Sequence, residues 1–283
     1  MLGPGDIQRP FALRRRRAGL VTCADAQPLT VCDQLDSPHR YGVISAQDMG
    51  DEDLAQLRSL LARPLSARRP LHPCLPLGER GQQEWVTSYA GKDQLVLRLC
   101  DWARDRGASR RSVAALEQAV DELLLNALFD APTDAGGTPR YVALSPRERL
   151  QVTAQPGEAA QVRFAADARR VVVAVRDPFG RLPRSTVLRY FRRCAEAQLA
   201  RQSPLEQKMG GSGVGLFLVL GAASELFFRL CPGRFTEVVY TVYRDRPAPL
   251  RAVILDDLWP VDTSANAAPD TGVVRPDDPS SVL

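Results

Sequence analysis

The chain has 283 residues, enough for one or two domains, and its 45% hydrophobic and 25% charged residues are ordinary for a soluble globular protein. No apolar run approaches the roughly 20 residues that span a bilayer, and the N-terminus lacks the features of a signal peptide, so we expect a cytoplasmic protein without a membrane segment. The net charge of +4 is too small for a dedicated nucleic-acid binder.

The cysteine and histidine content argues against disulfides and against a histidine-rich metal site. Six cysteines form no CxxC pair, and several lie within apolar runs, so we expect buried, reduced thiols. The only two histidines are His39 and His72, too few for a histidine-rich metal centre.

Residues 1–80 differ in pattern from the rest and predict a small or degenerate α/β module with a basic, flexible start. The arginine run 14–17 is open to two interpretations, a contact with nucleic acid or an acidic membrane, or a solvated tail, which we favour. A helix is predicted over 51–64, and a proline-rich link follows over 68–81.

From residue 84 the pattern becomes regular. A helix over 93–107 is predicted to end at Gly107, and Ser109 or Ser112 can cap the next helix, which is amphipathic from 113 to 127. Strands are predicted over 149–154, 161–166, 169–177, 226–231 and 235–243, with a helix over 214–225.

The sequence pattern also predicts the burial of one strand and the character of the C-terminal tail. The valine-rich strand 169–177 is apolar at consecutive positions, as expected for a strand that is covered on both faces. Residues 249–283 are predicted to form a largely disordered C-terminal tail, because their last twenty or so residues have a low apolar content.

Three motifs contain groups suited to ligand binding or catalysis. Glu122 and Asn126 are four residues apart, so they share one helix face, where the amide can ligate Mg²⁺ and the carboxylate can act as a base; a merely polar helix edge would look the same. Asp177 ends a buried strand, where it can accept a hydrogen bond from an adenine amine or simply initiate a turn. The loop 208–219, KMGGSGVGLFLV, can present backbone N–H groups to a phosphate.

These motifs and the late strand PGRFTEV occur in the order found in the GHKL ATPases, which include histidine kinases, type II topoisomerases, mismatch-repair ATPases and a heat-shock chaperone. The chain resembles this family over residues 84–245. It is most similar to the anti-sigma-factor serine/threonine kinases, whose glycine loop likewise runs into GLFLV-like residues. The resemblance implies a two-layer α/β sandwich, with a mixed sheet and helices on one face, that binds ATP and Mg²⁺.

The resemblance also implies roles for single residues. Glu122 would be the general base and Asn126 the Mg²⁺ ligand. Residues 181–209, a long, basic and partly helical connection, would form the ATP lid. Lys208 and Arg201 would reach phosphate from that lid, or lie on a solvated basic surface. The remaining nucleotide ligands would be Asp177 as the adenine reader, Gly180 in the adenine turn, Gly211, Gly213 and Gly215 as phosphate donors, and Thr236 beside the adenine.

The sequence departs from the family at several points. The adenine turn reads Asp-Pro-Phe-Gly, without a glycine two positions after Asp177, and Phe179 would either stack on the base or fill the core. Asp130 stands where the kinase branch often has histidine, and the insert after it is long. The chain has no Walker P-loop and no dinucleotide fingerprint, and neither histidine lies in a dimerisation motif of histidine kinases.

We therefore expect an ATP-binding signalling protein, either a serine/threonine kinase of the anti-sigma-factor type or a non-catalytic switch in which ATP controls partner binding. A scaffold that has lost nucleotide binding is the third alternative. The expected partner is a regulatory protein, such as a sigma factor or its antagonist, rather than nucleic acid or a membrane. The sequence leaves open whether the chain forms a homodimer.

Overall fold

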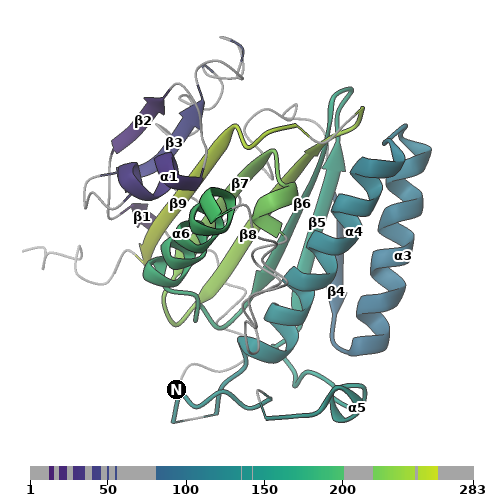
Figure 1. Cartoon of the computed structure of the whole chain (residues 1–283). Coiled ribbons are helices and arrows are strands. Elements are labelled where there is room, and N and C mark those ends of the chain that lie inside the picture. Colours follow the sequence, from purple (N-terminus) through teal and green to yellow (C-terminus); the bar gives the residue numbers. More distant parts are fainter. Residues whose placement is uncertain are drawn as a thin grey trace, which may run out of the picture.

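The computed structural model shows a mixed α/β protein built on one large sheet (Figure 1). It describes residues 13–15, 19–23, 28–35, 40–45, 50, 55, 81–134, 136–141, 143–200, 219–245 and 248–260. Within these residues the strands are β1 (Leu13–Arg15), β2 (Gly19–Cys23), β3 (Arg40–Ser45), β4 (Gln82–Val86), β5 (Ala160–Ala166), β6 (Arg170–Asp177), β7 (Glu225–Cys231), β8 (Phe235–Tyr243) and β9 (Ala252–Pro260). The helices are α1 (Pro28–Leu35), α3 (Tyr89–Asp105), α4 (Arg110–Leu125), the π-helical turn η2 (Asn126–Asp130), α5 (Pro146–Arg149) and α6 (Arg184–Ala200).

The strand order is β2-β3-β9-β7-β8-β6-β5-β4, and β1 pairs with β9 beside this path. Strands β2 and β3 run parallel, as do β7 and β9, while the other pairs are antiparallel, so the sheet is mixed as predicted. Because β3 pairs with β9, the described N-terminal strands extend the same sheet that contains β4 to β8. The division at residues 80 to 84 stays a prediction.

The helices of the main core lie over one face of the sheet (Figure 1). Side chains from α1, α3, α4 and α6 join alternate residues of the strands in a single hydrophobic cluster, to which β6 contributes Val171, Val173 and Val175. The intervening residues Val172 and Ala174 belong to a second buried cluster on the opposite face. The prediction that this strand is covered on both faces is therefore confirmed, and its consecutive valines reflect this double burial.

The two central helices begin and end as their sequences predict. Gly107 follows α3 with a φ of +78°, a conformation that favours glycine. The side chain of Ser109 caps α4 by accepting a hydrogen bond from the backbone N–H of Ser112, at 3.2 Å. The Ser112 hydroxyl in turn donates to the carbonyl oxygen of Tyr243 at 2.7 Å, which ties the start of α4 to the end of β8.

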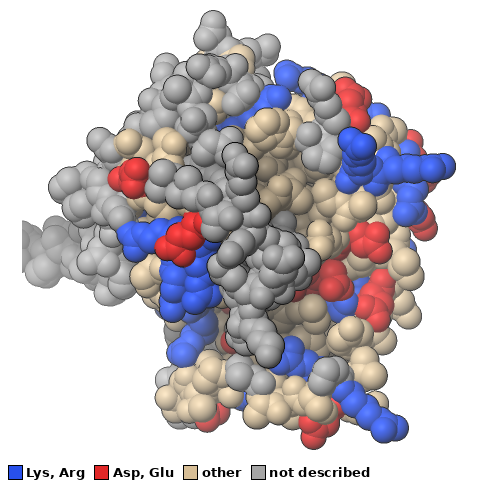
Figure 2. Space-filling model, viewed as in Figure 1, with Lys and Arg blue, Asp and Glu red and all other residues tan. Residues whose placement is uncertain are grey.

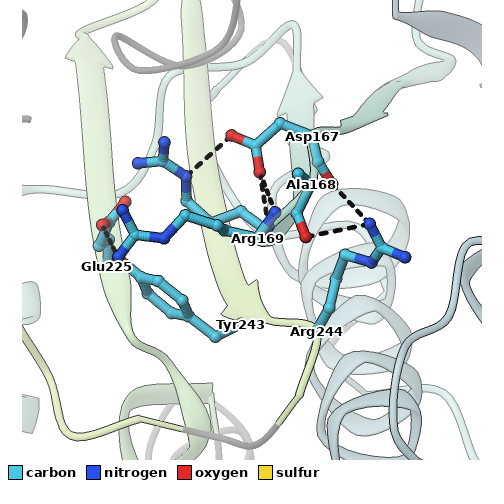
Figure 3. A network of polar contacts seen from close by, with 7 residues as sticks. Asp167, Ala168, Arg169, Glu225, Tyr243 and Arg244 are labelled. Atoms are coloured by element: carbon cyan, nitrogen blue, oxygen red, sulfur yellow. Dashed lines mark hydrogen bonds and ion pairs between the residues drawn. The ribbon is translucent and has the colours of Figure 1, made fainter.

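A polar network holds the same end of the sheet together (Figure 3). The carboxylate of Asp167 accepts hydrogen bonds from the backbone N–H groups of Arg169 and Arg170, both at 2.7 Å, and pairs with the Arg170 side chain at 3.0 Å. Arg244 donates to the carbonyl oxygens of Asp167 and Ala168 at 3.1 Å. With α4 anchored at this end, its C-terminal end projects toward the other end of β6.

On the face of the sheet opposite α4, a buried ion cluster joins β5, β7 and β8. Glu237 is buried and pairs with Arg163 at 2.7 Å and with Arg229. Burial alone would raise the pKa of Glu237, but the charges of three neighbouring guanidiniums hold it well below its usual range. In the β6–β8 register, Glu237 lies directly opposite Arg176. The neighbouring residues Thr236 and Asp177 form the next pair in the same register.

Three predictions about single elements are wrong. Residues 149–154 form no strand, because the capping box of Ser145 and Glu148 starts helix α5 just before them and leaves Leu150 exposed. Residues 252–260 do not belong to a disordered tail: they form β9, which pairs with both β3 and β7 and buries an apolar run. The basic N-terminal start is not a flexible tail throughout, because Arg14 and Arg15 lie in β1, which pairs with β9.

The predicted partly helical character of the lid segment is confirmed in its described part. Residues 184–200 form helix α6, in which Val187, Phe191 and Cys194 are buried in the core, so this half of the segment is a packed helix. Residues 201–209 of the lid, all but the last residue of the glycine loop and most of the predicted helices 51–64 and 214–225 lie outside the described residues. None of the helices in the described part of the chain is both long and apolar enough to cross a bilayer.

Candidate functional site

A cavity of about 260 Å³ lies where the C-terminal end of α4 meets the ends of β6 and β8 and the start of α6. Asn126, Asp177 and Thr236 all line it, although they come from three elements far apart in the sequence. Three residues to which the resemblance gives a role in nucleotide binding therefore share one cavity. Its volume is just below the roughly 300 Å³ at which small-molecule sites usually begin. The surface over α3 and α4 carries charges of both signs (Figure 2).

Asp177 occupies the inner part of this cavity at the end of β6. Its Oδ1 accepts hydrogen bonds from the backbone N–H groups of Phe179 at 2.8 Å and Gly180 at 3.1 Å, as expected for an aspartate that initiates a turn. The turn requires glycine at position 180, because φ is +63° and a Cβ there would lie 2.2 Å from the carbonyl oxygen of Cys231. Gly180 thus fixes the carboxylate through its backbone.

The electrostatics of Asp177 differ from those of a surface carboxylate. Only 8% of the residue is exposed, and burial raises the pKa of its carboxyl group. The backbone N–H groups of Phe179 and Gly180 act in the opposite direction by stabilising the ionised form. Among the described residues no arginine or lysine forms an ion pair with this carboxylate, so it can accept a further hydrogen bond from a neutral donor.

Thr236 lies directly across from Asp177 in the β6–β8 register. It is 4% exposed, and its Oγ1 has no hydrogen-bonding partner in the described part of the chain. The hydroxyl is close enough to the Asp177 carboxyl to lower its pKa, but the geometry falls short of a hydrogen bond. A buried hydroxyl without a partner is costly, and its position in the cavity wall leaves it available to a group in the cavity.

Asn126 begins the π-helical turn η2, in which the N–H of Ala131 donates to the carbonyl oxygen of Asn126 at 2.9 Å. Such turns insert one residue into a helix and often occur at functional sites. Asp130, the last residue of the turn, also lines the cavity. Burial raises the pKa of Asp130, and the charge of Arg149 acts against this effect. The amide oxygen and this carboxylate are the kinds of oxygen ligand that Mg²⁺ accepts.

Glu122, the predicted general base, lies one turn before Asn126 but is not among the residues that line the cavity. Burial raises the pKa of its carboxyl group, and the charges of Asp130 and Asp121 raise it further. The Asn126 side chain and the charge of Lys92 act in the opposite direction and lower the pKa. Glu122 is therefore placed to orient Asn126, and its raised pKa is a property that general bases share.

Some residues that the sequence singled out are not brought to the cavity. Phe179 is partly exposed and belongs to no core cluster, so it does not fill the core; it is not among the cavity-lining residues, and its stacking on a base stays a prediction. Gly211, Gly213 and Gly215 lie outside the described residues, as do Lys208 and Arg201.

The structure adds cavity residues that sequence reasoning missed. Arg181 follows the Asp177 turn, and Thr186 and Tyr190 come from the first turns of α6. From the sequence we expect all three residues in the ATP lid, because the segment 181–209 is basic and its amphipathic pattern is weak. Val187 and Phe191 are apolar positions four residues apart, and they are the signal that a packed helix begins here.

Comparisons with known proteins do not identify the chain. A scan against protein-family models found no match, and a search of curated proteins found none either. The similarity to GHKL ATPases therefore rests on the motifs of this sequence.

Proposed function

We propose that this protein binds Mg-ATP in the cavity between α4, α6 and the ends of β6 and β8, and that it acts in signalling. One observation carries the proposal: Asn126, Asp177 and Thr236, predicted from different motifs as ligands of one nucleotide, line a single cavity. The buried Thr236 hydroxyl without a partner and the Asp177 carboxylate without a cation form a pair suited to an adenine edge.

The two inner groups favour adenine over guanine. The Asp177 carboxylate accepts a hydrogen bond from the exocyclic amine of adenine, where guanine carries a carbonyl oxygen that would face the carboxylate unfavourably. The Thr236 hydroxyl donates to or accepts from the same edge. Because both groups are buried, a base that leaves either one unpaired loses affinity by the full desolvation cost of that group.

Asn126 is the proposed Mg²⁺ ligand, with Asp130 beside it in the same cavity wall. A bound Mg²⁺ supplies charge neutralisation for the phosphates. Gly211, Gly213 and Gly215 remain the proposed backbone donors to phosphate, and Glu122 the proposed base that orients or deprotonates an attacking hydroxyl. In this arrangement catalysis rests on positioning the hydroxyl of a partner protein against the terminal phosphate.

A second function, the non-catalytic ATP-gated switch, is favoured by a different observation. Glu122 lies one helical turn before Asn126 but does not line the cavity, whereas the carboxylate of Asp130 does and would repel a phosphate. A base that serves only to orient a metal ligand supports binding without turnover. Both functions require the same nucleotide site and the same class of regulatory protein partner.

Calorimetric titration with ATP and Mg²⁺ tests the binding site, with GTP as the control nucleotide. We expect saturable binding of ATP and none of GTP. Asp177→Asn should weaken ATP binding by about 100-fold, which corresponds to about 2.7 kcal/mol for a lost hydrogen bond to a charged group. Asp167→Asn is the matched control, because Asp167 accepts the same two backbone hydrogen bonds at the other end of β6. No binding by the wild type at millimolar ATP would end the proposal.

ADP release separates the kinase or ATPase from the switch. If the protein turns ATP over, Glu122→Ala should abolish ADP release while ATP affinity is retained, and Glu117→Ala, an exposed position on the same helix, should change neither. If the protein is a switch, the wild type should bind ATP without measurable ADP release. Loss of ATP binding in Glu122→Ala would show that Glu122 is needed to hold Asn126 and has no separate catalytic role.

A further inference from the structure

The cavity has a buried end and an exposed end that differ in charge. Asp177 and Thr236 form the buried end, whereas Asn126 and Asp130 are half-buried and Arg181 is exposed. Arg181 is the one cationic side chain among the described residues of the cavity wall. The chemistry therefore changes across the cavity from neutral hydrogen bonding to charge.

Arg181 is held in place without being neutralised. Its Nη2 donates to the carbonyl oxygen of Gly137 at 2.8 Å, which ties the turn after β6 to the loop that follows η2. No carboxylate within the described residues forms an ion pair with its guanidinium. A guanidinium has five N–H donors, and one carbonyl oxygen uses only one of them. The remaining donors form a planar fork that matches a phosphate group.

We infer that Arg181 contacts a phosphate of the bound nucleotide and makes the site selective for nucleotides over nucleosides. The inference rests on the proposed function and adds to it a ligand residue and a ligand class. With the base at the Asp177 end, the phosphates extend toward the exposed end, where Asp130 repels them unless positive charge is present. Arg181 supplies that charge from one wall, and the Mg²⁺ held at Asn126 supplies it from another.

The test compares adenosine, AMP, ADP and ATP, each with the wild-type protein and with Arg181→Gln at constant Mg²⁺. Arg181→Gln should weaken binding of at least one phosphorylated ligand by about 10-fold and leave adenosine affinity unchanged. The shortest ligand that loses affinity identifies the phosphate that Arg181 contacts. Arg111→Gln is the matched control, because Arg111 is exposed at the far end of α4, about 22 Å from Asn126 at 1.5 Å per residue.

Each result has one meaning. Equal losses for adenosine and ATP would show that Arg181 acts only by holding the Gly137 loop, and no loss for any ligand would show that it does not reach a phosphate; either result overturns the inference. Arg181→Lys keeps the charge without the fork and should give an intermediate loss for the phosphorylated ligands. If the wild type binds no ATP at all, the proposed function itself fails, which is a result distinct from an unaffected Arg181 variant.

Discussion

Strand β6 has an aspartate turn at each end, and the two turns differ in their surroundings. Asp167 and Asp177 each accept hydrogen bonds from the backbone N–H groups two and three residues later. Asp167 also forms an ion pair with Arg170 in a network of further hydrogen bonds (Figure 3), whereas Asp177 has no cationic partner within the described residues and lines a cavity with Thr236.

The difference distinguishes a carboxylate that stabilises the fold from one that is available to a ligand. Both aspartates satisfy the local requirement of a turn, so the motif alone does not separate them. At Asp167 the charge is compensated, and its removal should cost stability. At Asp177 the carboxyl group is buried beside a hydroxyl without a hydrogen-bonding partner in the described structure, an arrangement that costs stability.

The largest effect is expected from the turn at the cavity end. Gly180→Ala places a Cβ 2.2 Å from a backbone carbonyl oxygen at a φ of +63°, and should lower the free energy of unfolding by about 3–5 kcal/mol. Arg170, the equivalent position in the other turn, lies in a regular strand and has no such restriction. Urea denaturation measures the loss, and a change below about 1 kcal/mol would contradict the geometry of this turn.

Asp167→Asn should have the next largest effect on stability. The substitution removes the charge that compensates the buried Arg170, and we expect a loss of about 2–3 kcal/mol. The same change at Asp177 should alter stability by less than about 1 kcal/mol at neutral pH, because no cation among the described residues forms an ion pair with this carboxylate. Equal losses at the two positions would remove the distinction between the two turns.

A pH dependence sharpens the comparison. Because burial raises the folded-state pKa of Asp177 above its ordinary value of 3.8, the folded protein holds this proton to higher pH than the unfolded chain does. Stability attributable to this group is present below pH 3.8 and declines as pH rises through the raised pKa. The difference in unfolding free energy between Asp177→Asn and the wild type should therefore shift in favour of the variant as pH rises. A difference in unfolding free energy that does not change with pH would contradict the raised pKa of Asp177.

The smallest effects are expected at two threonines on opposite faces of β8. The hydroxyls of Thr236 and Thr241 are both buried without hydrogen-bonding partners in the described structure, so Thr236→Val and Thr241→Val should each raise stability by about 1 kcal/mol. Thr236 lines the cavity and Thr241 does not, so ATP affinity should fall only in Thr236→Val. Equal ATP affinities in the two variants would show that Thr236 does not contact the nucleotide.

The sequence alone determined the local features of this protein. The serine cap of α4, the glycine after α3 and the double burial of the valine-rich strand each follow from a few neighbouring residues, and the structure confirms them. The positions of Asn126, Asp177 and Thr236 were predicted from motifs, and the structure places them around one cavity. Their binding of a nucleotide stays a proposal.

Only the tertiary structure decided what surrounds these features. Residues 252–260 form a strand because β3 and β7 offer hydrogen bonds on both sides, and the helix in the lid segment packs on the sheet because the core accepts Val187 and Phe191. Likewise, Asp167 and Asp177 are alike in local pattern, and only long-range packing supplies a cation to one and a cavity to the other. Pairing partners and cavities depend on contacts between distant segments, which local pattern does not encode.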